Sequence, residues 1–224
     1  MSNFVIKIIA FVAMLLDHIK YSDSVFENFA TLYLGRLSYP LFAFLLVEGY
    51  VHTSNLKKYF ERLVVFGIIS QIPFMLFRTL VGEWVMLNIM FTLLLGLLCI
   101  TAYDKIKNKY ISISLVITLI TIGEILRVDY GWFGVTTIFI MYLLREKKMF
   151  LPLAYGIIVL VFYYSLVGLS DMFSKEYMLQ MLFMWLSTFI INAYNGEKGK
   201  SLKYFFYSFY PIHMMIVYLL HFLF

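Results

Sequence analysis

Ionisable side chains that lie within otherwise apolar stretches are the residues of this sequence best suited to chemistry. Such a side chain costs about 3 kcal/mol at the centre of a membrane helix unless it is paired or hydrated, so each marks a candidate functional site. A histidine beside a cation suits general-base chemistry, in which the imidazole removes a proton from an amine or hydroxyl and the cation stabilises developing negative charge. The same groups would equally suit a proton relay in a transporter. These residues are Lys7, Asp17, His18, Arg36, Glu48 and His213.

Lys7 and His18 fall on one face of the first predicted helix. They are 11 residues apart, and at about 100° per residue this spacing returns to the same face with a drift of about 20°. At about 1.5 Å per residue they lie about 16 Å apart along the axis, so a long substrate arm could touch both. The alternatives are a snorkelling anchor for Lys7 and a structural interfacial histidine for His18.

Arg36 and Glu48 in the second apolar stretch complete two layers of charge. Asp17 points about 100° away from His18, so we expect it to pair with a cation on another helix. The second stretch runs antiparallel to the first, which puts Arg36 at the depth of Asp17, and Glu48 at the depth of Lys7. We call Lys7 and Glu48 the first charged layer, and Asp17, His18 and Arg36 the second. Two structural ion pairs that clamp neighbouring helices are the alternative explanation.

Other polar residues are weaker candidates for the second layer. Gln71 and Asn88 lie in the third and fourth apolar stretches, where amides most often make hydrogen bonds between helices. Tyr130 lies in an expected turn beside that layer. Tyr210 and His213 lie in the last stretch, too deep for an aromatic belt at the membrane surface alone.

The composition requires membrane helices to position these residues. Of the 224 residues, 62% are hydrophobic and 14% charged, with a mean hydropathy of +0.87, whereas about a quarter of the residues in a soluble domain are charged. We therefore predict an all-α, polytopic integral membrane bundle that forms a single domain over residues 1–224. About nine spans fit this length, and Pro40 in the second removes a helix hydrogen bond, which opens a cavity or bends the helix. The apolar segments are about 4–20, 33–51, 62–78, 84–102, 110–126, 132–144, 149–168, 177–193 and 204–223.

The charges of the predicted connections indicate an orientation. The connections that follow even-numbered spans carry twelve Lys and Arg residues, and the other connections carry four. The positive-inside rule therefore puts the N-terminus in the cytoplasm and the C-terminus outside. The net charge of +5 is thus a signal of topology, and we expect no nucleic-acid partner. A basic cytosolic face would also attract anionic lipid or an anionic ligand such as a nucleotide.

Common catalytic and metal-binding signatures are missing from the sequence. Cys99 is the single cysteine, which excludes a disulfide framework and a cysteine-based metal site. The sequence has no HExxH, no Walker loop, no nucleophilic serine elbow and no set of three metal ligands at helical spacing. We therefore expect no metal.

The order of several short motifs resembles the TraX family, the conjugative pilin acetyltransferases and their chromosomal relatives in bacteria. The resemblance covers essentially the whole chain, and its specificity lies in the combination of motifs. They are Lys7 to Ala10, Met14 to Ile19, Gly35 to Tyr50, His52-Thr53, Ile69 to Phe74, Leu87 to Thr92, Asp129 to Gly131, Tyr194 to Gly196 and Phe209 to His213.

TraX proteins in turn resemble the wider transmembrane acyltransferases, which take acetyl-CoA from the cytosol and acetylate an acceptor on the far side of the membrane. The first helix of those enzymes often carries a basic residue, ten intervening residues and a histidine, as Lys7 and His18 do. The resemblance implies that His18 is the catalytic base, with Asp17 and Arg36 beside it. The residues expected at acetyl-CoA are Lys7, Glu48, His52, Lys57 and Lys58, and those expected to support the site are Gln71, Asn88, Tyr130, Tyr210 and His213.

The resulting hypothesis is acetyl transfer across the bacterial cytoplasmic membrane. Acetyl-CoA docks on the basic cytosolic face, and His18 activates an acceptor at the outer face. A pilin N-terminus, a glycan or a cell-wall hydroxyl would all fit as acceptor. The alternatives are a small proton-coupled transporter or flippase that uses the same charges, and a structural membrane partner of a secretion or pilus apparatus.

Overall fold

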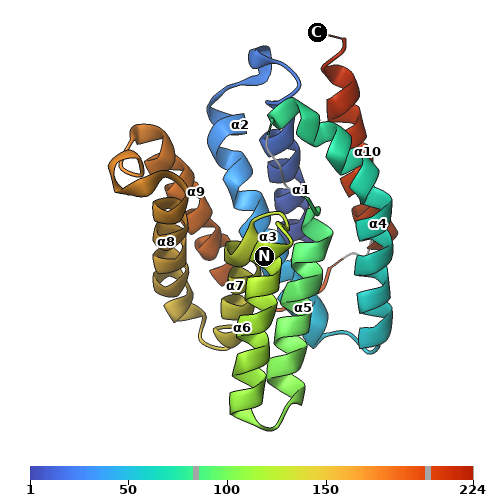
Figure 1. The fold of residues 1–224 in the computed structure, drawn as a ribbon, viewed down its shortest axis with the longest axis vertical. Helices are drawn as coiled ribbons and strands as arrows, with labels where there is room; N and C mark the ends of the chain where they lie inside the picture. Colours follow the sequence, from blue (N-terminus) through green and yellow to red (C-terminus); the bar gives the residue numbers. More distant parts are fainter. Residues whose placement is uncertain (83–85, 200–202, 224) are drawn as a thin grey trace.

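The computed structural model describes residues 1–82, 86–199 and 203–223, and it is built from helices (Figure 1). Lys200, which is one of the twelve basic residues of the connections above, lies outside the described residues, as do residues 84–85 of the fourth predicted span. The longer helices are α1 (Asn3–Ile19), α3 (Ser38–Val51), α4 (Leu56–Val81), α5 (Ile89–Lys105), α6 (Lys109–Ile125), α7 (Gly131–Leu143), α8 (Leu151–Asp171), α9 (Lys175–Asn192) and α10 (Lys203–Leu220). The shorter ones are η1 (Ser24–Phe26), α2 (Phe29–Tyr33), η2 (Leu34–Leu37) and η3 (Lys148–Phe150).

Within the described residues, each predicted apolar segment except the second corresponds to one of the longer helices, with ends shifted by a few residues. Polar caps explain several of these ends. Ser2, Asn55, Asn88, Asn108 and Ser174 each accept a backbone N–H of the first helical turn that follows, which stabilises a helix by about 1 kcal/mol. The helix that begins after Asn55 therefore starts six residues before the predicted segment 62–78.

The second predicted segment is broken into α2, η2 and α3. The Asn28 side chain accepts the N–H groups of Ala30 and Thr31 and so begins α2. Pro40 lies in the first turn of α3, where a backbone N–H has no helical partner. The predicted loss of a helix hydrogen bond at Pro40 is therefore wrong. The irregular turn is η2, which carries Arg36.

Among the described residues, three stretches of helix are long and apolar enough to cross a membrane, namely 29–51, 56–81 and 148–171. The other longer helices of the described chain are at most 18 residues long, and some of them are interrupted by charge. The structure thus confirms an all-helical protein with membrane-like helices. Nine membrane spans and a cytoplasmic N-terminus stay predictions.

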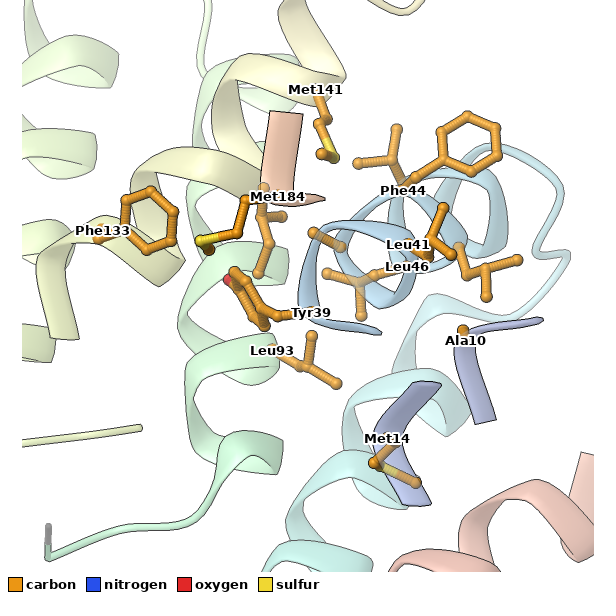
Figure 2. Close-up of a cluster of buried hydrophobic side chains, with 14 of the residues drawn as sticks. Ala10, Met14, Tyr39, Leu41, Phe44, Leu46, Leu93, Phe133, Met141 and Met184 are labelled. Carbon is orange, nitrogen blue, oxygen red and sulfur yellow. The ribbon is translucent and has the colours of Figure 1, made fainter. Parts of the chain in front are cut away.

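α3 occupies the centre of the molecule. It packs against α1, α5, α7 and α9, and nearly all of its residues from Ser38 to Glu48 are buried. Figure 2 shows Tyr39, Leu41, Phe44 and Leu46 of α3 surrounded by side chains of these neighbouring helices. A helix that is apolar all round is stable when other helices cover every face, so the neighbours of α3 fix its position.

η2 lies unusually close to α1. A Cβ atom added at Gly35 would lie 2.7 Å from both Cα and Cβ of Asp17, so glycine is required for this approach. The next residue along the chain is Arg36. The sequence of η2 therefore brings a guanidinium beside the acidic residue of α1.

Candidate active site

A cavity of about 610 Å³ connects the two charged layers. Its wall includes Lys7 and Glu48 of the first layer, and Asp17, His18 and Arg36 of the second. The volume lies within the range of about 300–1,000 Å³ usual for small-molecule sites. Apolar side chains line the space between the layers, so the cavity suits a long ligand with polar ends. They include Phe11, Met14, Phe42, Leu45, Leu46 and Leu63.

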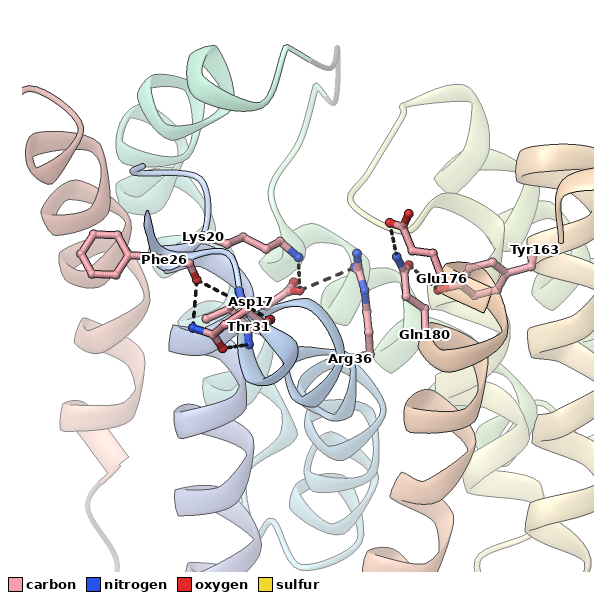
Figure 3. Close-up of polar contacts among 9 residues, drawn as sticks. Asp17, Lys20, Phe26, Thr31, Arg36, Tyr163, Glu176 and Gln180 are labelled. Atoms are coloured by element: carbon pink, nitrogen blue, oxygen red, sulfur yellow. Dashed lines mark hydrogen bonds and ion pairs between the residues drawn. The ribbon is translucent and has the colours of Figure 1, made fainter. Parts of the chain in front are cut away.

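Asp17 lies between two cations in the second charged layer. Its Oδ1 atom is 3.0 Å from Lys20 Nζ and 3.6 Å from Arg36 Nη1, so the expected pair with Arg36 is present and a second cation joins it (Figure 3). On its other side Arg36 faces the Tyr163 and Gln180 side chains, which share a hydrogen bond of 3.1 Å (Figure 3). Arg36 thus lies between an acidic and a neutral polar part of the cavity wall.

His18 contacts a second histidine from the other end of the chain. His18 Nδ1 lies 2.8 Å from His213 Nε2, and His213 Nδ1 lies 2.9 Å from the carbonyl oxygen of Phe209. The ring of Phe77 packs edge-on against His18 at 5.0 Å. His18 lines the cavity, whereas His213 lies behind it and is 2% exposed.

The first charged layer is built around Glu48, which is 6% exposed. Its Oε2 atom lies 3.6 Å from Nδ1 of His52, which is itself exposed. Burial and the nearby Glu48 carboxylate raise the pKa of the Tyr194 hydroxyl to about 12, so this hydroxyl stays a neutral hydrogen-bond donor. Lys7 and Lys198 also line this end of the cavity and are close enough to repel each other. Cations and a neutral donor therefore line this end of the cavity together with the Glu48 carboxylate.

The N-terminal residues hold the loop that carries Lys198. The amino group of Met1 donates to the carbonyl oxygen of Ala193, and Asn195 N–H donates to the Met1 carbonyl at 3.0 Å. Asn3 N–H donates to the Glu197 carbonyl at 2.8 Å. This backbone pairing brings a basic loop beside the start of α1.

Comparison with known proteins identifies the family of the chain. The family model described as TraX protein matches residues 2–221. The chain belongs to the TraX family. A similar protein is the probable fimbrial assembly protein FimC, serogroup H1, of Dichelobacter nodosus. The two sequences are 31% identical over an alignment of 246 residues, which covers 96% of this chain and 94% of that protein. No solved structure matches the chain.

Most of the motifs that resemble TraX proteins converge on the cavity. Besides the five members of the charged layers, its wall includes the predicted residues His52, Tyr130 and Tyr210. Tyr130 has a left-handed backbone with φ of 63°, which is uncommon for a residue other than glycine, and its ring stacks on Tyr39 at 4.2 Å. Such strain persists where the surrounding packing enforces it and is frequent at functional sites.

Besides His213, four predicted residues of this TraX protein lie outside the cavity wall. Lys57 and Lys58 are exposed at the start of α4, and Lys57 pairs with Glu61 at 4.0 Å. Asn88 is fully buried, and its Nδ2 atom donates to Gln71 Oε1 at 2.8 Å and to the Gly67 carbonyl at 2.7 Å. Gln71 and Asn88 therefore join α4 to α5, as amides in bundles usually do.

Several residues of the cavity wall were not identified from the sequence. Arg62 and Arg78 count as charges at the ends of the predicted segment 62–78, but α4 extends past both of them, and both line the cavity. The Asn55 cap was the sequence signal for the longer helix. Lys198, Tyr163 and Gln180 have no comparable signal, because tertiary packing brings their helices and loops to the site.

The described part of the chain has no group of three or more His, Cys, Asp or Glu residues that could hold a metal ion. The ionisable groups of the cavity wall include His18 and His52, the carboxylates of Asp17 and Glu48, several cations and tyrosine hydroxyls. Cys99 is buried in a separate apolar cluster around Leu95 and Val116, with no part in the cavity wall.

Proposed function

We propose that this TraX protein is a membrane acetyltransferase that moves an acetyl group from acetyl-CoA to an acceptor amine or hydroxyl. The single observation that carries the proposal is the cavity that joins the two charged layers. Lys7 and His18 both line it, and they lie about 16 Å apart along α1. One end therefore suits an anionic donor, and the other suits a general base.

The residues at the first charged layer fit acetyl-CoA as donor. Lys7, Arg62 and Lys198 supply positive charge for its phosphates, and Arg62 also lies over the ring of Tyr59 at 5.4 Å. The apolar wall between the layers suits the long pantetheine arm. Acetyl-CoA supplies the activated acyl group when it is bound.

His18 would act as general base at the second charged layer. Its imidazole takes the proton of the acceptor amine or hydroxyl, so that the acceptor can attack the acyl carbon, and later returns that proton to the departing thiolate. Arg36 would stabilise the negative charge that develops on the acyl oxygen. Asp17 and Lys20 hold Arg36 and its surroundings in place through the ion pairs described above.

The proposed setting is the bacterial cytoplasmic membrane. With nine spans and a cytoplasmic N-terminus, the first charged layer would face the cytosolic donor, and the second would face an acceptor outside. Similarity to a probable fimbrial assembly protein favours a fimbrial subunit as acceptor over a glycan or a cell-wall hydroxyl.

The test uses purified protein in detergent or lipid nanodiscs. Acetyl-CoA should raise the unfolding temperature, and labelled acetyl groups should pass to an acceptor preparation from the cell surface. His18→Ala should lose transfer and keep the thermal shift with acetyl-CoA. Absence of both the shift and transfer, together with proton-coupled uptake in proteoliposomes, would instead establish the transporter.

A further inference from the structure

His213 is a buried polar residue with no place in the cavity wall. It is 2% exposed, and the ring of Phe209 stacks on it at 5.1 Å with an interplanar angle of 12°. A buried imidazole is costly unless its nitrogen atoms are hydrogen-bonded. Both nitrogen atoms of His213 have partners, and these partners define where its proton lies.

The Phe209 carbonyl fixes the tautomer of His213. A carbonyl oxygen only accepts hydrogen bonds, so His213 Nδ1, which lies 2.9 Å from it, carries a proton. In the described part of the chain the hydrogen-bond partners of His213 are His18 and the backbone of Phe209 and Tyr210, with no carboxylate among them. A neutral ring is therefore favoured, and its Nε2 atom keeps a lone pair.

The tautomer of His213 in turn fixes that of His18. His213 Nε2 accepts, so His18 Nδ1 at 2.8 Å must donate. A neutral His18 then has its lone pair on Nε2. Hydrogen bonds thus link the Phe209 carbonyl to His213 and His213 to His18, which lines the cavity.

We propose that His213 is a positioning residue that holds His18 in the tautomer required of a base at Nε2. This inference rests on the proposed function. During transfer the acceptor nitrogen or oxygen bonds to the acyl carbon while its proton passes to His18 Nε2. When the bond from the acyl carbon to sulfur breaks, the thiolate takes that proton back. Throughout, His18 Nδ1–H stays bonded to His213 Nε2, which stabilises the transient imidazolium without receiving the proton.

Two substitutions separate the hydrogen bond from the packing. His213→Phe keeps an aromatic ring against Phe209 but removes the acceptor for His18 Nδ1–H. His213→Gln keeps an acceptor oxygen at a similar distance from the backbone. We expect His213→Phe to lower kcat about 100-fold or more with KM for acetyl-CoA within about twofold, and His213→Gln to recover all but about tenfold. A merely structural role would not give rescue by glutamine.

Nitrogen NMR of histidine-labelled protein reports the tautomer without any need for activity. The His18 signals, assigned by their loss in His18→Gln, should show a protonated Nδ1 in the native chain and a different tautomer in His213→Phe. His221→Phe is the matched control, because His221 follows α10 and bonds the Ser22 carbonyl at 2.9 Å, away from His18. It should change neither tautomer nor kcat.

Two results would overturn the inference. One is a native His18 protonated at Nε2, and the other is His213→Phe with unchanged kcat. Full activity of His18→Ala would instead overturn the proposed function, even if the expected tautomer is found.

Discussion

At the scale of single residues, substitution of Arg36 distinguishes a catalytic role of the second charged layer from a structural one. Arg36→Ala should lower kcat by about 100-fold to 1,000-fold if the guanidinium stabilises developing charge. It should also destabilise the fold by only about 1–3 kcal/mol, because Lys20 still neutralises Asp17 at 3.0 Å. Steady-state kinetics and thermal unfolding measure the two effects.

The double variant Asp17→Asn with Arg36→Gln removes both charges of the pair. We expect it to be no more stable than Arg36→Ala, since Lys20 then loses the carboxylate that lies 3.0 Å from its Nζ atom, and to remain as slow as that variant. Recovery of activity along with stability would show that the pair only clamps α1 to η2.

At the scale of elements, the contact of η2 with α1 positions the guanidinium. Gly35→Ala would put a Cβ atom 2.7 Å from the backbone of Asp17, so η2 must move away. We expect a loss of about 1–3 kcal/mol in unfolding free energy and a fall in kcat, with KM for acetyl-CoA unchanged.

Gly156→Ala in α8 is the control for Gly35→Ala. Its added Cβ would meet only Trp185 side-chain atoms at 3.3 Å and 3.4 Å, and alanine favours a helix interior. Denaturation of Gly35→Ala and Gly156→Ala in the same detergent gives their unfolding free energies for comparison. Equal stability and activity of the two would contradict a positioning role for the close approach at Gly35.

At the scale of the whole molecule, the end of the cavity that is proposed to bind acetyl-CoA depends on cations from α1, α4 and the loop after α9. Arg62→Gln and Lys198→Gln should each raise KM for acetyl-CoA about tenfold, because a hydrogen bond to a charged group contributes about 1.5–3 kcal/mol. Their kcat values should stay near that of the native chain, since both residues lie at the far end of the cavity from His18.

Lys57→Gln is the matched control, because Lys57 is exposed on α4 outside the cavity wall. Its KM should be unchanged at physiological salt. If Lys57→Gln and Arg62→Gln raise KM equally, the basic face attracts the donor by general electrostatics, and the end of the cavity at the first charged layer is not the binding site.

The sequence by itself determined the helical fold class, the approximate ends of the helices and the membership of the TraX family. These follow from local information: apolar runs, polar caps such as Asn55 and ordered short motifs. Helical spacing also put Lys7 and His18 on one face, and the structure has both in one cavity wall. The pairing of Asp17 with Arg36 followed from the equal depth of the two residues in antiparallel apolar stretches.

Only the tertiary structure decided which polar residues reach the cavity and which join helices. Gln71 and Asn88 bond to each other because α4 and α5 pack together, whereas Arg62 and Lys198 reach the cavity. The contact between His18 and His213 joins residues 195 positions apart. Periodicity assigns a residue to a face of its own helix, but the neighbour that the face meets depends on how all the helices pack. For this reason the sequence predicted His18 as a candidate base, whereas only the packing of the helices shows its contact with His213.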